Sequence, residues 1–185
     1  MKKSLLAVSL GLMAAMAGTS AFAATSTGQI NFIGTINANT CPIDPVDPVT
    51  GAPGPINLGN VAAVDFGGVA DTEVGGREFA LRVKDGAACG FGPSDTATVT
   101  FTSTHGNAGT GGKYYAIQTG GAGGVALTLK DRNNGAIDNG TPSIPYPLNE
   151  TGETRMVFHA KYRSISTTVT PGPVVANINF VATYP

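Results

Sequence analysis

The two cysteines, Cys41 and Cys89, are the residues whose chemistry is most constrained by the sequence. A disulfide is the default state of such a pair in an exported protein. A bridge between them would close a loop of roughly 50 residues and stabilise the fold by about 4 kcal/mol through loop-closure entropy. A metal or redox pair would instead need further ligands or a closer spacing. We therefore predict a disulfide between Cys41 and Cys89.

The other residues that could do chemistry form no catalytic or metal-binding pattern. His105 falls in a glycine-rich loop and His159 on the outward face of a predicted strand, and neither is paired with a nucleophile motif, a second metal ligand or a carboxylate at motif spacing. Asp44 and Asp47 lack the glycine and glutamate of a calcium loop. The glycine cluster 120–124 lacks the Lys-Ser/Thr pair of a phosphate-binding loop and predicts a flexible hairpin loop. We expect no enzyme, metal, cofactor or small-molecule substrate.

The first 23 residues have the pattern of a secretory signal peptide. Two lysines and a short apolar stretch, Leu5–Ala17, precede an A-x-A motif, so we expect cleavage between Ala23 and Ala24. The apolar stretch is too short to span a bilayer of ~30 Å, which argues against a membrane anchor. Loss of the two lysines leaves a net charge of about −3 without a basic block, which argues against nucleic acid or an anionic membrane as partner.

Glycine-rich composition and short alternating runs indicate an all-β protein. The chain has 26 glycines and 12% charged residues, and outside the leader it has no sustained helical stripe. Five prolines between residues 42 and 55 exclude a central strand and predict an extended loop. The predicted strands of the body are 56–61, 78–83, 96–102, 114–117, 125–130, 155–163 and 176–184. About seven antiparallel strands favour an immunoglobulin-like β-sandwich, with a closed barrel as the alternative.

Two alternating stretches stand at opposite ends of the mature chain. Near the C-terminus one face carries Ala176, Ile178, Phe180, Ala182 and Tyr184. No later strand exists to pair with this one, so an earlier strand or another chain must cover its edge. Near the N-terminus one face carries Ile30, Phe32, Gly34 and Ile36. We interpret the two stretches as halves of one joint, in which the first strand of one molecule lies beside the last strand of the next.

These features together resemble the structural subunits of bacterial chaperone–usher fimbriae, the type 1 and P pilus pilins. The resemblance covers essentially the whole mature chain and rests on four features. The extension Ile30-x-Phe32-x-Gly34-x-Ile36 ends shortly before Cys41, and Cys41 and Cys89 are spaced like the family's disulfide. Phe158-x-Ala160-x-Tyr162 lies on the penultimate strand. Gly172 stands 14th from the C-terminus and Tyr184 is penultimate. The Pro-rich insert after Cys41 and the terminal Pro185 depart from the family pattern.

The resemblance implies an incomplete immunoglobulin-like sandwich that lacks its seventh strand and is completed by a donor strand from a neighbouring subunit. It divides the chain into a signal peptide (1–23), a donor-strand extension (24–40) and a pilin domain (41–185). Ile30, Phe32, Gly34 and Ile36 would form the donor strand. The groove that contacts chaperone and neighbouring subunit would be lined by Gly172, Ala176, Ile178, Phe180, Ala182 and Tyr184.

The implied function is that of a structural subunit that polymerises with copies of itself or with other pilins and supports cell adhesion. The implied partners are a periplasmic chaperone and an outer-membrane usher, and the protein would pass through the periplasm to a fimbrium on the cell surface. Two alternatives stay open. A tip adhesin would carry an extra lectin domain and no extension, and a monomeric secreted carbohydrate-binding sandwich would need exposed aromatic side chains.

Overall fold

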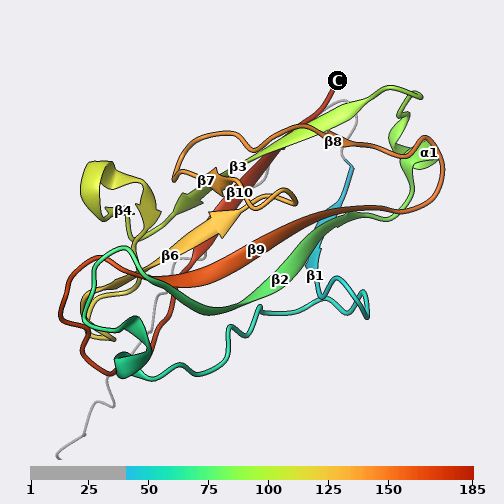
Figure 1. The fold of residues 1–185 in the computed structure, drawn as a ribbon. Coiled ribbons are helices and arrows are strands. Elements are labelled where there is room, and N and C mark those ends of the chain that lie inside the picture. The colour runs from blue at the N-terminus through green and yellow to red at the C-terminus, as the bar shows by residue number, and fades with distance from the viewer. Residues whose placement is uncertain (1–40) are drawn as a thin grey trace, which may run out of the picture. The chain divides into compact units, whose positions relative to one another are not determined.

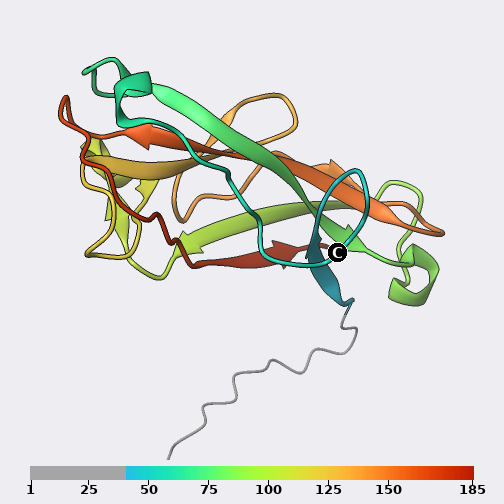
Figure 2. The ribbon, with the colours of Figure 1, turned by 90° about the horizontal axis from the view of Figure 1, so that it is seen from below.

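Antiparallel strands make up most of the regular structure in residues 41–185, which are the residues that the computed structural model describes. The predicted cleavage site at Ala23 and Ala24 and the predicted donor strand of Ile30, Phe32, Gly34 and Ile36 lie outside the described residues. The arrangement of the strands in two layers is shown in Figure 1 and, from below, in Figure 2. No helix within residues 41–185 is long and apolar enough to cross a membrane.

The larger sheet is built on two long central strands. Its order is β1 (Ile43–Val46), β2 (Glu73–Val83), β9 (Thr154–Ser164), β6 (Val125–Lys130), β5 (Tyr114–Tyr115) and β4 (Asn107–Ala108), and β7 (Ala136–Ile137) also pairs with β6. The smaller sheet has the order β10 (Ile178–Thr183), β3 (Thr96–Ser103) and β8 (Tyr146–Pro147). Three short helices, η1 (Ala63–Phe66), α1 (Gly86–Cys89) and η2 (Thr110–Gly112), lie in the connections. The two sheets do not close into a barrel.

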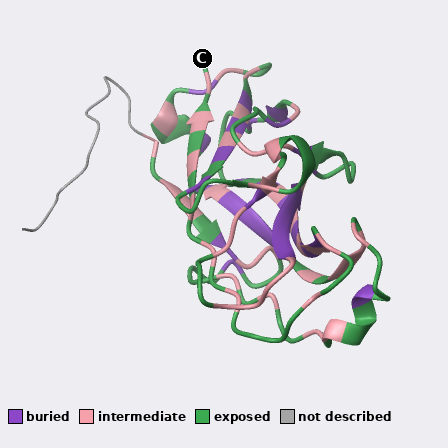
Figure 3. Ribbon diagram, turned by 90° about the vertical axis from the view of Figure 1, so that its left-hand side faces the viewer, coloured by how far each residue is buried: buried purple, intermediate pink, exposed green. Residues whose placement is uncertain are grey.

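The two sheets meet through a cluster of aromatic rings centred on Phe158. Its ring centroid lies 5.5 Å from that of Phe79 in the same sheet, and 5.0 Å and 4.9 Å from those of Phe101 and Tyr146 in the smaller sheet. Phe158 is fully buried, and the neighbouring inward positions of β9 are buried as well (Figure 3). Burial of a large apolar side chain contributes about 1.5–3 kcal/mol, so this cluster is a major source of cohesion between the sheets.

Most predicted strands are present, with changed bounds. β6 has the predicted bounds, and β3, β9 and β10 differ from them by one or two residues at an end. β2 begins five residues earlier than predicted, because Gly75 and Gly76 form a bulge that interrupts the alternation. Both glycines have positive φ, and a Cβ at Gly76 would collide with the carbonyl of Ala160, so the bulge requires glycine.

The Pro-rich segment after Cys41 contains a strand, which corrects the prediction of a loop throughout. β1 pairs with β2, and Pro45 stands opposite Leu81. Proline removes one backbone donor, which excludes it from central strands but permits it at an edge, and β1 is the edge of the larger sheet. The segment from 47 to 53 then turns back, and Pro53 forms an isolated bridge with Val46.

The predicted disulfide between Cys41 and Cys89 is present. The two Cα atoms lie 5.4 Å apart. The bond joins Cys41, which precedes β1, to Cys89, the last residue of α1. Both cysteines pack at the margin of the hydrophobic core. The bridge therefore fixes the first strand of the domain to the connection between β2 and β3.

The outer face of the larger sheet carries a network of ion pairs. Arg163 contacts Glu73 at 2.8 Å and Asp71 at 3.2 Å, and Lys130 contacts the other oxygen of Glu73 at 2.6 Å. Burial opposes ionisation of Glu73, but its hydrogen bond and charge interaction with Lys130 and the charge of Arg163 together lower its pKa. The guanidinium of Arg163 also lies 4.6 Å from the ring centroid of Tyr114. The network links β2, β6 and β9.

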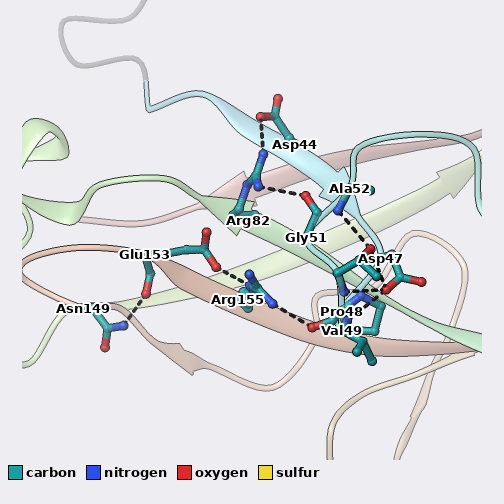
Figure 4. Close-up of polar contacts among 11 residues, drawn as sticks. Asp44, Asp47, Pro48, Val49, Gly51, Ala52, Arg82, Asn149, Glu153 and Arg155 are labelled. Carbon is teal, nitrogen blue, oxygen red and sulfur yellow. Dashed lines mark hydrogen bonds and ion pairs between the residues drawn. The ribbon is translucent and has the colours of Figure 1, made fainter.

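Asp47 organises the loop that follows β1 (Figure 4). Its carboxylate accepts hydrogen bonds from the backbone N–H groups of Val49 and Thr50 at 3.0 and 2.9 Å and contacts Arg77 at 3.2 Å. The carbonyls of Pro48 and Gly51 accept hydrogen bonds from Arg155 and Arg82. The N–H of Thr50 and the side chain of Arg77 lower the pKa of Asp47 from 3.8 to about 2.

We expect acid to release this loop in a defined pH window. Because the pKa of Asp47 is lowered in the folded loop, the ionised carboxyl stabilises that loop at every pH above 3.8, the pKa of the unfolded chain. This contribution is lost as the pH falls from 3.8 through about 2. The titration of the Asp47 carboxyl followed by NMR should have its midpoint near the lower value, and the Thr50 amide should shift with it. A midpoint near 3.8 would show that the hydrogen bonds do not hold in solution.

Candidate functional site

The candidate site is an open apolar groove with a volume of about 1010 Å³. Its two walls are the segment 55–63, which follows the Pro-rich loop, and the C-terminal segment 169–180 (Figure 2). Its floor is made of core side chains from both sheets and from η1, which are Phe66, Phe79, Leu81, Phe101, Val125, Leu127, Leu129, Ala160 and Tyr162. The floor side chains are themselves buried, so the groove runs over the hydrophobic core between these walls.

The C-terminal wall is an edge strand with one row of free backbone groups. β10 pairs with β3 on one side only. The N–H of Thr104 donates to the carbonyl of Asn177 at 2.9 Å, which places the odd-numbered residues of this strand toward β3. The even-numbered residues Ile178, Phe180 and Ala182 therefore direct their N–H and C=O groups to the open side. Their side chains are only half-buried and pack against the core.

In the opposite wall, residues 55–62 precede η1 and belong to no strand. The sequence predicts a strand at 56–61, and the structure corrects this, since no ladder forms there. The apolar side chains of Ile56, Leu58 and Val61 are half-buried and pack against the core. The hydroxyl of Tyr162 donates a hydrogen bond to the carbonyl of Gly59 at 2.8 Å. The predicted strand is therefore wrong, because within residues 41–185 no neighbouring strand pairs with this segment.

The groove carries no charged side chain in its lining. The ionisable group on its floor is Tyr162, and burial raises the pKa of this phenol. Residues 41–185 contain no group of three or more His, Cys, Asp and Glu residues that could hold a metal ion. The groove is therefore suited to an extended apolar segment that supplies backbone hydrogen bonds.

The groove residues predicted from sequence divide into two groups. Gly172, Ala176, Ile178 and Phe180 line the groove, whereas Ala182 and Tyr184 lie beyond it on the same strand face. The ring centroid of Tyr184 lies 5.5 Å from that of Phe91 in an edge-to-face contact. The Tyr184 hydroxyl accepts a hydrogen bond of 3.4 Å from the N–H of Cys41. Tyr184 thus joins the end of β10 to the disulfide region.

The sequence did not indicate that the segment 55–63 forms a wall of the groove. It also did not indicate that the loop 118–124 supports the groove. The alternation of Ile56 and Leu58 with polar neighbours could have indicated that the segment 55–63 turns one apolar face toward the core. The loop predicted to be flexible is hydrogen-bonded to the C-terminal segment at Gln118, Ala122 and Gly123. No periodicity marks that role, because it depends on which distant backbone the glycines meet.

One family model and one solved structure above 30% identity match most of this chain. A family model described as fimbrial protein matches residues 30–185. A solved antigen and type I fimbria protein from Burkholderia pseudomallei is 32% identical, with 86% of this chain and 99% of that chain covered and a TM-score of 0.56. A comparison with curated protein sequences gives no significant match.

Two more distant structures share the fold. A chain of a chaperone–usher pilus is 19% identical, with 86% of this chain and 96% of that chain covered and a TM-score of 0.60. The CupB6 tip adhesin from Pseudomonas aeruginosa is 20% identical, with 69% of this chain and 35% of the adhesin covered and a TM-score of 0.56. At these identities the likeness concerns the fold alone.

Proposed function

The chain belongs to the fimbrial protein family, and from that premise we propose that it is a structural subunit that polymerises by donor-strand exchange. The observation that carries the proposal is the uncharged groove between two backbone edges, β10 and the segment 55–62, neither of which has a strand partner on the groove side within residues 41–185. An inserted strand would pair with the free backbone edge and cover the half-buried apolar side chains of the walls. Strand addition of this kind is a recurrent mode of recognition.

The proposed occupant is the extension 24–40 of a neighbouring copy or of another pilin. Ile30, Phe32 and Ile36 would fill the groove, and Gly34 would leave room where it is shallow. Burial of three large apolar side chains contributes roughly 5–9 kcal/mol, whereas ordering about nine residues costs a similar amount at ~1–2 kcal/mol each. Backbone hydrogen bonds along the free edge of β10 must therefore contribute much of the affinity.

The proposed joint is head-to-tail, because the extension and the groove are different surfaces of one chain. Such a contact generates an open filament. Before assembly the apolar groove and its free backbone edge require protection, so a periplasmic chaperone would occupy the groove and an outer-membrane usher would exchange it for the next subunit. The resulting fimbrium would stand on the cell surface and support adhesion.

Replacement of Gly34 by leucine tests the donor side. We expect fibres to be lost while the subunit stays folded, because the extension lies outside the predicted domain 41–185 and the added side chain meets the shallow part of the groove. Fibres would be counted by electron microscopy on cells that assemble the wild-type protein. Gly28→Leu, which lies before the alternating stretch, is the control and should leave fibres intact. Wild-type fibres from Gly34→Leu would refute the proposed glycine role.

The alternative functions find less support. The tip adhesin from Pseudomonas aeruginosa shares only the fold, and this chain spans about a third of its length. A monomeric carbohydrate-binding sandwich would need exposed aromatic rings, and every Phe and Tyr side chain within residues 41–185 is buried or half-buried.

A further inference from the structure

The C-terminal wall of the groove extends beyond β10, and the loop between β5 and β6 holds this extra part. The N–H of Gln118 donates to the carbonyl of Val175 at 2.8 Å, and the N–H of Ala122 donates to that of Pro173 at 3.0 Å. Gly123 and Thr170 exchange backbone hydrogen bonds of 3.2 and 3.0 Å. The loop 118–123 is therefore hydrogen-bonded to the segment 170–175, which lies before the part of the chain that pairs with β3.

The close approach of these two backbones depends on glycine at both sides. A Cβ on Gly172 would lie 2.6 Å from the backbone nitrogen of Ala122 and 2.7 Å from the carbonyl carbon of Gly121. A Cβ on Gly121 would collide with the carbonyl oxygen of Pro173. Because the obstructing atoms are backbone, the contact could not be relieved by rotation of a side chain. Gly172 has an ordinary φ. Glycine is therefore required at this position by the close packing of the two backbones and not by a backbone conformation that only glycine adopts.

The loop contacts determine which backbone groups face the groove. The carbonyls of Pro173, Val175 and Asn177 all point away from it, toward the loop or toward Thr104. By the alternation of an extended chain, Val174 and Ala176 direct their backbone groups to the open side, in line with the even-numbered residues of β10. Within the described residues neither Val174 nor Ala176 makes a backbone–backbone hydrogen bond. The free row thus runs from Val174 to Ala182.

We propose that the loop 118–124 is a positioning element that extends the docking edge of the groove from β10 back to Val174. The extended edge is as long as the alternating segment 29–37, so it accepts a whole segment of that length, whereas β10 alone offers only Ile178, Phe180 and Ala182. This inference rests on the proposed function, because it assigns to the loop the part of the edge that receives one end of the donor segment.

Gly172→Ala tests the proposal in the full chain, and Gly92→Ala is the matched control. Both glycines have ordinary φ, but a Cβ at Gly92 meets only Asp95 at 3.7 Å, which is a normal contact. We expect Gly172→Ala to slow fibre formation at least tenfold while Gly92→Ala has no effect. Hydrogen exchange of the monomer should show loss of protection at the Gln118 and Ala122 amides only, with Thr104 and the β3 amides still protected.

The two readouts separate the possible failures. Retained protection of the Gln118 and Ala122 amides in Gly172→Ala would refute the steric role of the glycine. Lost protection with a wild-type rate of fibre formation would refute the extended docking edge. Loss of protection throughout β3 would show a general structural role in place of a positioning one. If Phe180→Glu, which places a charge in the lining of the groove, also forms normal fibres, the proposed function itself is wrong.

Discussion

Phe180→Glu is expected to abolish fibres, whereas Val181→Glu on the same strand leaves them intact. Phe180 lines the groove, and Val181 is 64% exposed on the opposite face of β10. Loss of the phenyl group removes about 1.5–3 kcal/mol of burial, and an unpaired buried carboxylate costs several kcal/mol more. Because about 1.4 kcal/mol is a tenfold change in affinity, binding of a second chain should weaken by at least about a thousandfold.

The measurement is the amount and length of fibres on cells, together with the yield of soluble subunit. Circular dichroism and an intact disulfide in the purified Phe180→Glu chain would show that the domain still folds. Equal fibre numbers for the two variants would mean that the groove is not where subunits join. Loss of fibres in both would mean that the outer face of β10 takes part in assembly.

Cys41→Ser is expected to lower the melting temperature of the subunit by about 8–16 °C. Loop-closure entropy for this bridge corresponds to about 4 kcal/mol, and each kcal/mol shifts the melting temperature by about 2–4 °C in a domain of this size. The disulfide holds the start of β1, and the Cys41 N–H contacts Tyr184 at the end of β10. The loss should therefore also loosen the edge that receives the donor strand.

Calorimetry of the full mature chain measures this effect, and Cys89→Ser provides the matched variant. Both single variants and the double variant should melt at the same temperature, because each removes the same bond. A melting temperature within about 2 °C of the wild type would contradict a stabilising role. Different melting temperatures for the two single variants would show that the loss of stability comes from the replaced side chains and not from the missing disulfide.

The sequence predicted the central strands because their alternation is uninterrupted. In β9 the inward residues Met156, Phe158, Ala160 and Tyr162 are buried as predicted, since both neighbours of this strand are present in the same chain. β1 was missed because Pro45 is compatible with a strand only at an edge, and edge position is a property of the whole sheet.

The candidate site was predicted in part, for a related reason. Residues Ala176, Ile178 and Phe180 of the C-terminal wall follow from the alternation and from the resemblance to fimbrial subunits. The second wall at 55–63 was predicted as an ordinary strand, because the sequence does not show that its ladder partners are missing. The role of Gly121 and Gly172 in backbone packing could not be predicted, because it depends on a contact between segments far apart in sequence.

The most direct test of the account mixes two defective subunits in one cell. Gly34→Leu carries an intact groove with a blocked extension, and Phe180→Glu carries an intact extension with a blocked groove. Each alone should give no polymer, and together they should give a one-to-one dimer, identified by native mass spectrometry, that grows no further because its remaining donor and remaining groove are both defective. If the mixture yields only monomers, or if either variant polymerises alone, the extension of one subunit does not occupy the groove of the next.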